Sequence, residues 1–130
     1  MKTAVAKARF PKTVLIVDDN VAIRKIVRER FLSDGFNLCA EAGSGREAID
    51  VAAEIKPHLI VLDLSMPIMN GLEAAPILKD LLPETKIILF TQFGDHLKHI
   101  NPVLKGVSAI VAKDRPLDEL IRLARDILEG

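Results

Sequence analysis

The sequence predicts an α/β fold in which five βα units build one doubly wound parallel sheet. Short apolar runs recur along the chain, segments with helical periodicity separate them, and four runs end in polar residues. The runs predict strands at about 13–18, 37–42, 59–63, 86–91 and 108–112. Parallel strands need crossover connections, which the alternating helices supply. The 130 residues, 49% of them hydrophobic, suffice for one compact domain.

The first two helices are predicted from apolar stripes after the first two strands. The first stripe consists of Ala22, Ile23, Ile26, Val27 and Phe31. The second consists of Ala48, Ile49, Ala52 and Ile55. This second helix is expected to begin at a capping box formed by Ser44 and Glu47.

The remaining three helices follow the last three strands. The third has apolar residues at helical spacing, namely Ala74, Ile77, Leu78 and Leu81. It contains Pro76, which costs little only if it falls in the first turn. The fourth, within 95–105, should be short or kinked, because Pro102 disfavours helical geometry at the residue before it. The fifth begins near Pro116, a residue suited to a first helical turn.

The order of the strands predicts where the polar residues meet. Right-handed crossovers limit how five units can wind, and the flavodoxin-like order 2-1-3-4-5 is the common solution at this size. The first strand then lies beside the third, so Asp18 and Asp19 should face Asp63 across about 4.8 Å. Thr91 and Lys113 end the next two strands. One edge of the sheet should therefore collect three carboxylates, a hydroxyl and an ammonium.

These groups predict a metal-assisted phosphoryl chemistry. Three carboxylates at one edge repel by about 4 kcal/mol per pair at 4 Å and an effective dielectric of about 20. A Mg²⁺ ion with oxygen ligands would offset that repulsion. Asp63 would then be available as a nucleophile toward a phosphoryl group, whose oxygens Thr91 and Lys113 would stabilise. Glu41, in the second strand, is expected to lie outside this site.

Each of these residues also has a structural explanation when it is taken alone. Asp19 or Asn20 could simply cap the first helix, and Asp63 could start a turn. Thr91 and Lys113 could be a turn residue and a solvated charge. The functional interpretation therefore depends on the coincidence of polar signals at four strand ends.

The composition narrows the classes of partner. Eighteen basic and eighteen acidic residues cancel, which argues against direct binding of nucleic acid or of an anionic membrane by this domain. No apolar run approaches the ~18 residues of a membrane span. Residues 1–11 lack the apolar core of a secretory signal and are expected to form a disordered basic tail. The single Cys39 excludes an intramolecular disulfide, and we expect a cytoplasmic setting.

Four segments of the chain carry a family resemblance: VLIVDDN, LIVLDLSMPIMNG, IILFT and AIVAKD. They resemble the receiver domain of two-component response regulators, the CheY-like family, and predict one such domain over 12–130. The resemblance implies that Asp63 accepts a phosphoryl group from a histidine kinase, a phosphotransfer protein or a small acyl phosphate. It implies Mg²⁺ binding by Asp19, Asp63 and the Ser65 carbonyl, with Asp18 acting through water. Thr91 and Lys113 would contact the phosphate.

The resemblance also implies how such a domain signals. Phosphorylation would switch the region of the fourth helix and so control an effector domain or an output protein. The chain would catalyse only its own phosphoryl transfer and dephosphorylation. The family's aromatic switch position is occupied by Ile110, and the small residue after the threonine is replaced by Gln92. Asp114 stands where a proline often follows the lysine, so a cis bond is not expected there.

Two alternative functions are compatible with parts of the sequence. A pseudo-receiver that only binds a protein partner would fit Ile110 and the proline in the fourth helix. A Mg²⁺-dependent phosphatase with an aspartyl nucleophile would need an acid two residues after Asp63, where this chain has Ser65.

Overall fold

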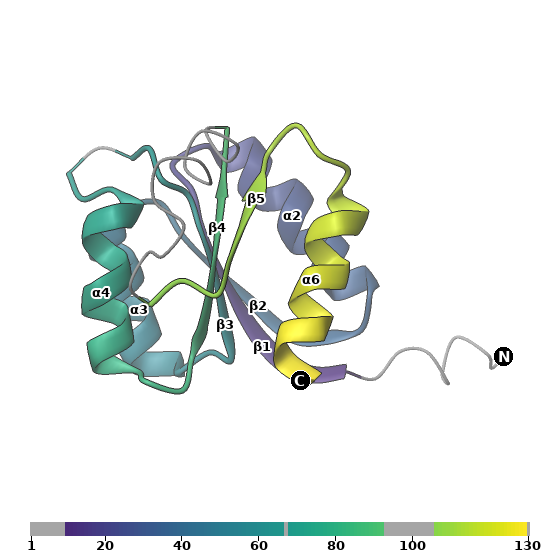
Figure 1. The fold of residues 1–130 in the computed structure, drawn as a ribbon, viewed down its shortest axis with the longest axis horizontal. Coiled ribbons are helices and arrows are strands. Elements are labelled where there is room, and N and C mark those ends of the chain that lie inside the picture. Colours follow the sequence, from purple (N-terminus) through teal and green to yellow (C-terminus); the bar gives the residue numbers. More distant parts are fainter. Residues whose placement is uncertain (1–9, 67, 93–105, 130) are drawn as a thin grey trace, which may run out of the picture.

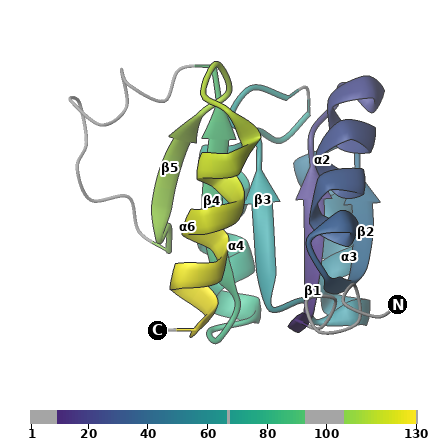
Figure 2. The same cartoon turned by 90° about the vertical axis from the view of Figure 1, so that its right-hand side faces the viewer.

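The computed structural model describes residues 10–66, 68–92 and 106–129, which form a three-layer α/β/α sandwich (Figure 1). The strands are β1 (Phe10–Val17), β2 (Phe36–Ala42), β3 (Leu59–Leu62), β4 (Lys86–Thr91) and β5 (Ala109–Ala112). The helices are α2 (Val21–Ser33), α3 (Gly45–Ile55), α4 (Gly71–Leu81) and α6 (Leu117–Glu129). Helices α3 and α4 cover one face of the sheet, and α2 and α6 cover the other (Figures 1 and 2).

All five strands are parallel, and their order β2-β1-β3-β4-β5 confirms the predicted winding. The start of β1 differs from the prediction, because the strand already pairs at Phe10, opposite Phe36 of β2. The predicted helix within 95–105 lies outside the described residues. No helix among the described residues has the length and the apolar character needed to cross a membrane.

The core lies on both faces of the central strands. Leu59 and Val61 pack with residues of α2 and α6, whereas Ile60 and Leu62 pack with residues of α3 and α4. Successive side chains of a strand point to opposite faces, so β3, which is buried throughout, must be apolar at every position. This explains why the strands appear in the sequence as continuous apolar runs.

The first two described helices begin at polar caps. The Asn20 side chain accepts from the Ile23 N–H at 3.1 Å, so Asn20 caps α2. Ser44 caps α3 by accepting from the Glu47 N–H at 3.1 Å. The predicted reciprocal box is wrong in its second half, because the Glu47 carboxylate accepts from the Gly43 N–H rather than from Ser44.

Helix α4 begins earlier than its proline suggested. Asn70 and Glu73 form a full capping box, in which each side chain accepts from the backbone N–H of the other. Since the helix starts at Gly71, Pro76 is its sixth residue and not part of the first turn. The cap outweighs the proline, whose missing N–H leaves the Leu72 carbonyl without its usual helical donor.

Candidate functional site

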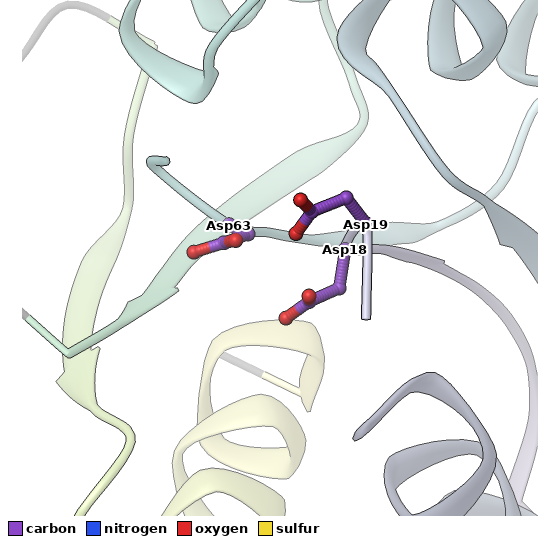
Figure 3. A group of neighbouring side chains, drawn as sticks. All are labelled: Asp18, Asp19 and Asp63. Atoms are coloured by element: carbon purple, nitrogen blue, oxygen red, sulfur yellow. The ribbon is translucent and has the colours of Figure 1, made fainter. Parts of the chain in front are cut away.

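The polar residues predicted from the strand ends meet at one edge of the sheet. Asp18 follows β1 and Asp63 follows β3, and these strands are neighbours, with Val17 opposite Leu62. The Asp63 N–H donates to the Val17 carbonyl at 2.9 Å, which continues the ladder into the site. Figure 3 shows the side chains of Asp18, Asp19 and Asp63 lying close together. Parallel pairing therefore brings together carboxylates that are far apart in the sequence.

The three carboxylates form a compact group of oxygen ligands. Asp18, Asp19 and Asp63 each offer an oxygen within 4.8 Å of the others. Asp18 and Asp63 are 2% and 4% exposed, whereas Asp19 is exposed. Because Asn20 caps α2, the carboxylate of Asp19 is not the helix cap. An oxygen-only set with an open side is the chemistry that Mg²⁺ prefers, since this ion keeps several waters.

Lys113 supplies the positive charge of the site. Its Nζ lies 2.6 Å from Asp18 Oδ2 and 3.3 Å from Asp63 Oδ1. The side chain thus reaches from the end of β5 across to β3 and β1. The Lys113 N–H also donates to the Thr91 carbonyl at 2.9 Å, which ties the ends of β4 and β5 together. One ammonium is shared by two buried carboxylates.

Burial raises the pKa of the Asp63 carboxyl above its ordinary value, and the neighbouring charge of Asp18 raises it further. The Lys113 ammonium and a hydrogen bond from the Ser65 backbone lower that pKa but do not outweigh the first two causes. An added cation at the carboxylates would favour the ionised form of Asp63. The electrostatics of the site therefore suit a divalent metal and an ionised nucleophile together.

An open pocket of about 280 Å³ lies over these groups. Its lining consists of Asp18, Asp19, Asn20, Ile23, Asp63, Ser65, Gln92 and Lys113. A water molecule takes up about 30 Å³ in the liquid, so the pocket has room for a hydrated cation and a phosphoryl group.

Two predicted residues lie beside this pocket rather than in its lining. Thr91 is fully buried at the end of β4, next to the strand that carries Asp63. Ile110 is half-buried in β5 opposite Leu89 and packs against the core on the α3 and α4 face. The peptide bond between Lys113 and Asp114 is trans.

Sequence reasoning missed two glycines that hold the loop after Asp63. A Cβ on Gly71 would lie 2.3 Å from the Asp63 carbonyl oxygen, and the Gly71 N–H donates to the Leu64 carbonyl at 2.9 Å. A Cβ on Gly45 would lie 2.6 Å from the Met69 carbonyl oxygen. No L side chain fits at either contact without a backbone shift. The Asn-Gly pair before the α4 pattern was the available signal for the first of them.

Comparison with known proteins gives a consistent family match. The family model for the response regulator receiver domain matches residues 14–125. A putative transcriptional regulator of Pseudomonas aeruginosa is 38% identical over 117 residues, which cover 90% of this chain and 56% of that protein. The chemotaxis protein CheY of Thermotoga maritima is 32% identical over 102 residues, 78% of this chain and 85% of that protein. The chain spans about half the length of the transcriptional regulators that it matches.

Solved structures give the same result. The response regulator TrrA of Thermotoga maritima, solved in complex with Mg²⁺-BeF, has a TM-score of 0.79 and 29% identity, covering 88% of this chain and 97% of that one. A LuxR-family response regulator of Aurantimonas sp. SI85-9A1 has a TM-score of 0.80 and 27% identity, covering 93% of this chain and 87% of that one.

Proposed function

Because the chain belongs to the response regulator receiver domain family, we propose that it is a phosphoacceptor domain of two-component signal transduction, phosphorylated on Asp63. The observation that carries this proposal is the position of Asp63, which is buried beside two further carboxylates and within 3.3 Å of Lys113. Among the three acids it is the one that follows β3, the strand paired with β4, so it lies between the other two carboxylates and the strand that ends at Thr91. Residues 12–130 would form the receiver domain.

The oxygen ligands fit Mg²⁺ as the cofactor. Asp19, Asp63 and the carbonyl of Ser65 would hold the ion directly, and Asp18 would act through a bound water. When bound, the ion would reduce the repulsion among the carboxylates and neutralise charge on the phosphoryl oxygens. The solved complex of the relative TrrA with Mg²⁺-BeF supports this choice.

The phosphoryl transfer would proceed by attack of an Asp63 carboxylate oxygen on phosphorus. The P–N bond of a phosphohistidine, or the P–O bond of a small acyl phosphate, would break, and the leaving group would take the electron pair. Lys113 would place its ammonium on a phosphoryl oxygen, and the Thr91 hydroxyl would donate to another. Water would later hydrolyse the phosphoryl group from Asp63. The domain would therefore catalyse only its own phosphorylation and dephosphorylation.

The phosphodonor would be a histidine kinase or a phosphotransfer protein in the cytoplasm. Apolar side chains are exposed on α2 beside the site, with Val21 64% and Ile26 56% accessible. An apolar hollow of about 200 Å³ that includes Ile26 and Leu117 shares Lys113 with the acidic pocket. Exposed apolar surface of this kind is typical of protein contacts. The transcriptional regulators, of which the matched part covers only 56% and 51%, support an output through an effector domain or an output protein.

Intact mass after treatment with acetyl phosphate tests the phosphoacceptor. The parent chain should gain one phosphoryl group in the presence of Mg²⁺ and far less in EDTA. Asp63→Asn should abolish the gain, whereas Asp50→Asn, the same change at an exposed position of α3, should not. A full phosphoryl gain by Asp63→Asn at the parent rate would refute the assignment.

Switching would follow from Thr91 and the loop that begins at Gln92. Phosphorylation adds charge and strong acceptors at Asp63, toward which Thr91 can move. Ile110 has no ring to rotate, so the change should concentrate in residues 92–105, most of which lie outside the described residues. Hydrogen exchange with Mg²⁺ and beryllofluoride would measure it. Unchanged protection at 92–105 despite confirmed binding would favour a pseudo-receiver, and a change centred on 108–112 would identify Ile110 as the switch.

A further inference from the structure

Arg24 lies behind the acidic group and joins three elements of the fold. Its Nη1 donates to the Asp18 carbonyl oxygen at 2.6 Å, and its Nε donates to Glu41 Oε1 at 3.0 Å. The side chain is 16% exposed, which limits competition from water. One guanidinium of α2 thus connects the turn after β1 to β2.

The Asp18 carbonyl that accepts from Arg24 belongs to the peptide bond between Asp18 and Asp19, the first two acids of the site. Asp18 is further held by its N–H, which donates to the Ala42 carbonyl at 3.1 Å, and by its carboxylate, which accepts from the Asn20 N–H at 2.9 Å and lies 2.6 Å from the Lys113 ammonium. Asp19 is exposed, so packing does not fix its side chain. Its direction depends on the peptide plane that Arg24 holds.

We infer that Arg24, oriented by Glu41, is a positioning residue that fixes the Asp18–Asp19 peptide for Mg²⁺ binding. The inference rests on the proposed function. The planar fork of arginine can serve two acceptors in different directions at once, which a lysine ammonium does not reproduce. Glu41 offsets the charge of Arg24, so the effect on the metal ligands is mainly geometric.

Two neighbours of Arg24 support this arrangement. A Cβ on Gly43 would lie 3.3 Å from Arg24 Nη1, so glycine leaves the guanidinium its room. The other oxygen of Glu41 lies 3.6 Å from Arg28 Nε, which donates instead to the Cys39 carbonyl, so the hydrogen bond that orients Glu41 is the one from Arg24. Glu41 was expected to lie outside the site. It is not among the residues that line the pocket, but it acts on Asp18 through Arg24.

Calorimetric titration of the full chain with MgCl₂ tests the inference. The chain has neither Trp nor Tyr, so heat is a better signal than intrinsic fluorescence. We expect Arg24→Gln to weaken Mg²⁺ binding about tenfold, which is the usual effect of removing a group that orients a metal ligand. Arg24→Lys should not restore the parent affinity. Glu41→Gln should weaken binding by a smaller factor, and it serves as the test if Arg24→Gln does not fold.

The matched control is Arg28→Gln. Arg28 contacts Glu41 and the Cys39 carbonyl from the same helix but is not among the donors to Asp18. Its variant should bind Mg²⁺ within about twofold of the parent, a change well below that of an orienting group. Far-UV circular dichroism confirms that each variant is folded, and the amide resonances of Asp19 and Asn20 should shift in Arg24→Gln without metal.

The outcomes separate this inference from the proposed function. A parent chain that does not bind Mg²⁺ would refute the proposed metal site and the inference with it. If the parent binds Mg²⁺ and both Arg24→Gln and Glu41→Gln bind it as tightly as the parent does, the inference is refuted and the proposed metal site is not. Parent-like affinity in Arg24→Lys would show that charge suffices, and an equal loss in Arg28→Gln would show a general effect of the helix. Either result overturns the positioning role.

Discussion

Neutralising Asp63 should stabilise the fold in the absence of metal. Asp18 and Asp63 offer oxygens within 4.8 Å of each other, and two unit charges at that distance repel by about 3.5 kcal/mol at an effective dielectric of about 20. Burial adds a desolvation cost. Lys113 opposes both, but Asp18 is its nearer partner, at 2.6 Å against 3.3 Å. We therefore expect Asp63→Asn to raise the free energy of unfolding by about 1–2 kcal/mol at pH 7, or the Tm by about 4–8 °C.

The effect should depend on pH in a defined direction. Because the pKa of Asp63 is raised above 3.8, the folded protein binds this proton more tightly than the unfolded chain does. The parent therefore loses stability as the pH rises from about 3.8 through the raised pKa. The amide that Asp63→Asn introduces cannot titrate, so the gap between variant and parent should be small below that range and largest near neutral pH. Urea unfolding followed by circular dichroism in EDTA measures it.

Mg²⁺ should reduce the difference in the free energy of unfolding between Asp63→Asn and the parent. At about ten times its Kd, a ligand adds about 1.4 kcal/mol to the stability of the parent by mass action. Asp63→Asn has lost one ligand and should gain less. Asp50→Asn, on the exposed side of α3, should stay within about 0.5 kcal/mol of the parent. A variant at Asp63 that is less stable than the parent at pH 7, or a gap that does not change with pH, would refute the electrostatic reasoning.

Three further predictions concern the surroundings of the site. Ile68 has φ 70° and is 87% exposed, so Ile68→Gly should relieve left-handed strain and raise the free energy of unfolding by about 1 kcal/mol, measured in urea. Gly71→Ala should lower that free energy by about 2 kcal/mol and slow phosphorylation by acetyl phosphate, because its Cβ would press on the Asp63 carbonyl; parent-like values would show that the loop adapts. Burial raises the pKa of the Cys39 thiol to about 12, so a thiol reagent at pH 8 should label the unfolded chain at least about a hundredfold faster than the native one.

Local sequence signals were enough for most of the fold. Strand β3 is apolar at every position, and β1 and β4 are apolar except near their ends, because both faces of the sheet are covered. That pattern is visible without coordinates. Crossover handedness then leaves few windings, which is why the strand order was predicted correctly. The ends of the helices and strands were harder to predict. The helix containing Pro76 could not be placed until the Asn70 cap was seen, because a proline and a capping box compete and packing decides between them.

The sequence by itself determined which residues stand at the strand ends, because a polar residue that ends an apolar run is a local signal. It can be recognised without knowing which residues lie near it in space. Only the tertiary structure decided how those residues share their charges. The two contacts of Lys113, the burial of Asp63 beside Asp18, and the hold of Arg24 on the Asp18 carbonyl join residues from different strands and helices. Such contacts depend on distances of a few ångströms set by the packing of the whole sheet, and local sequence patterns do not contain them.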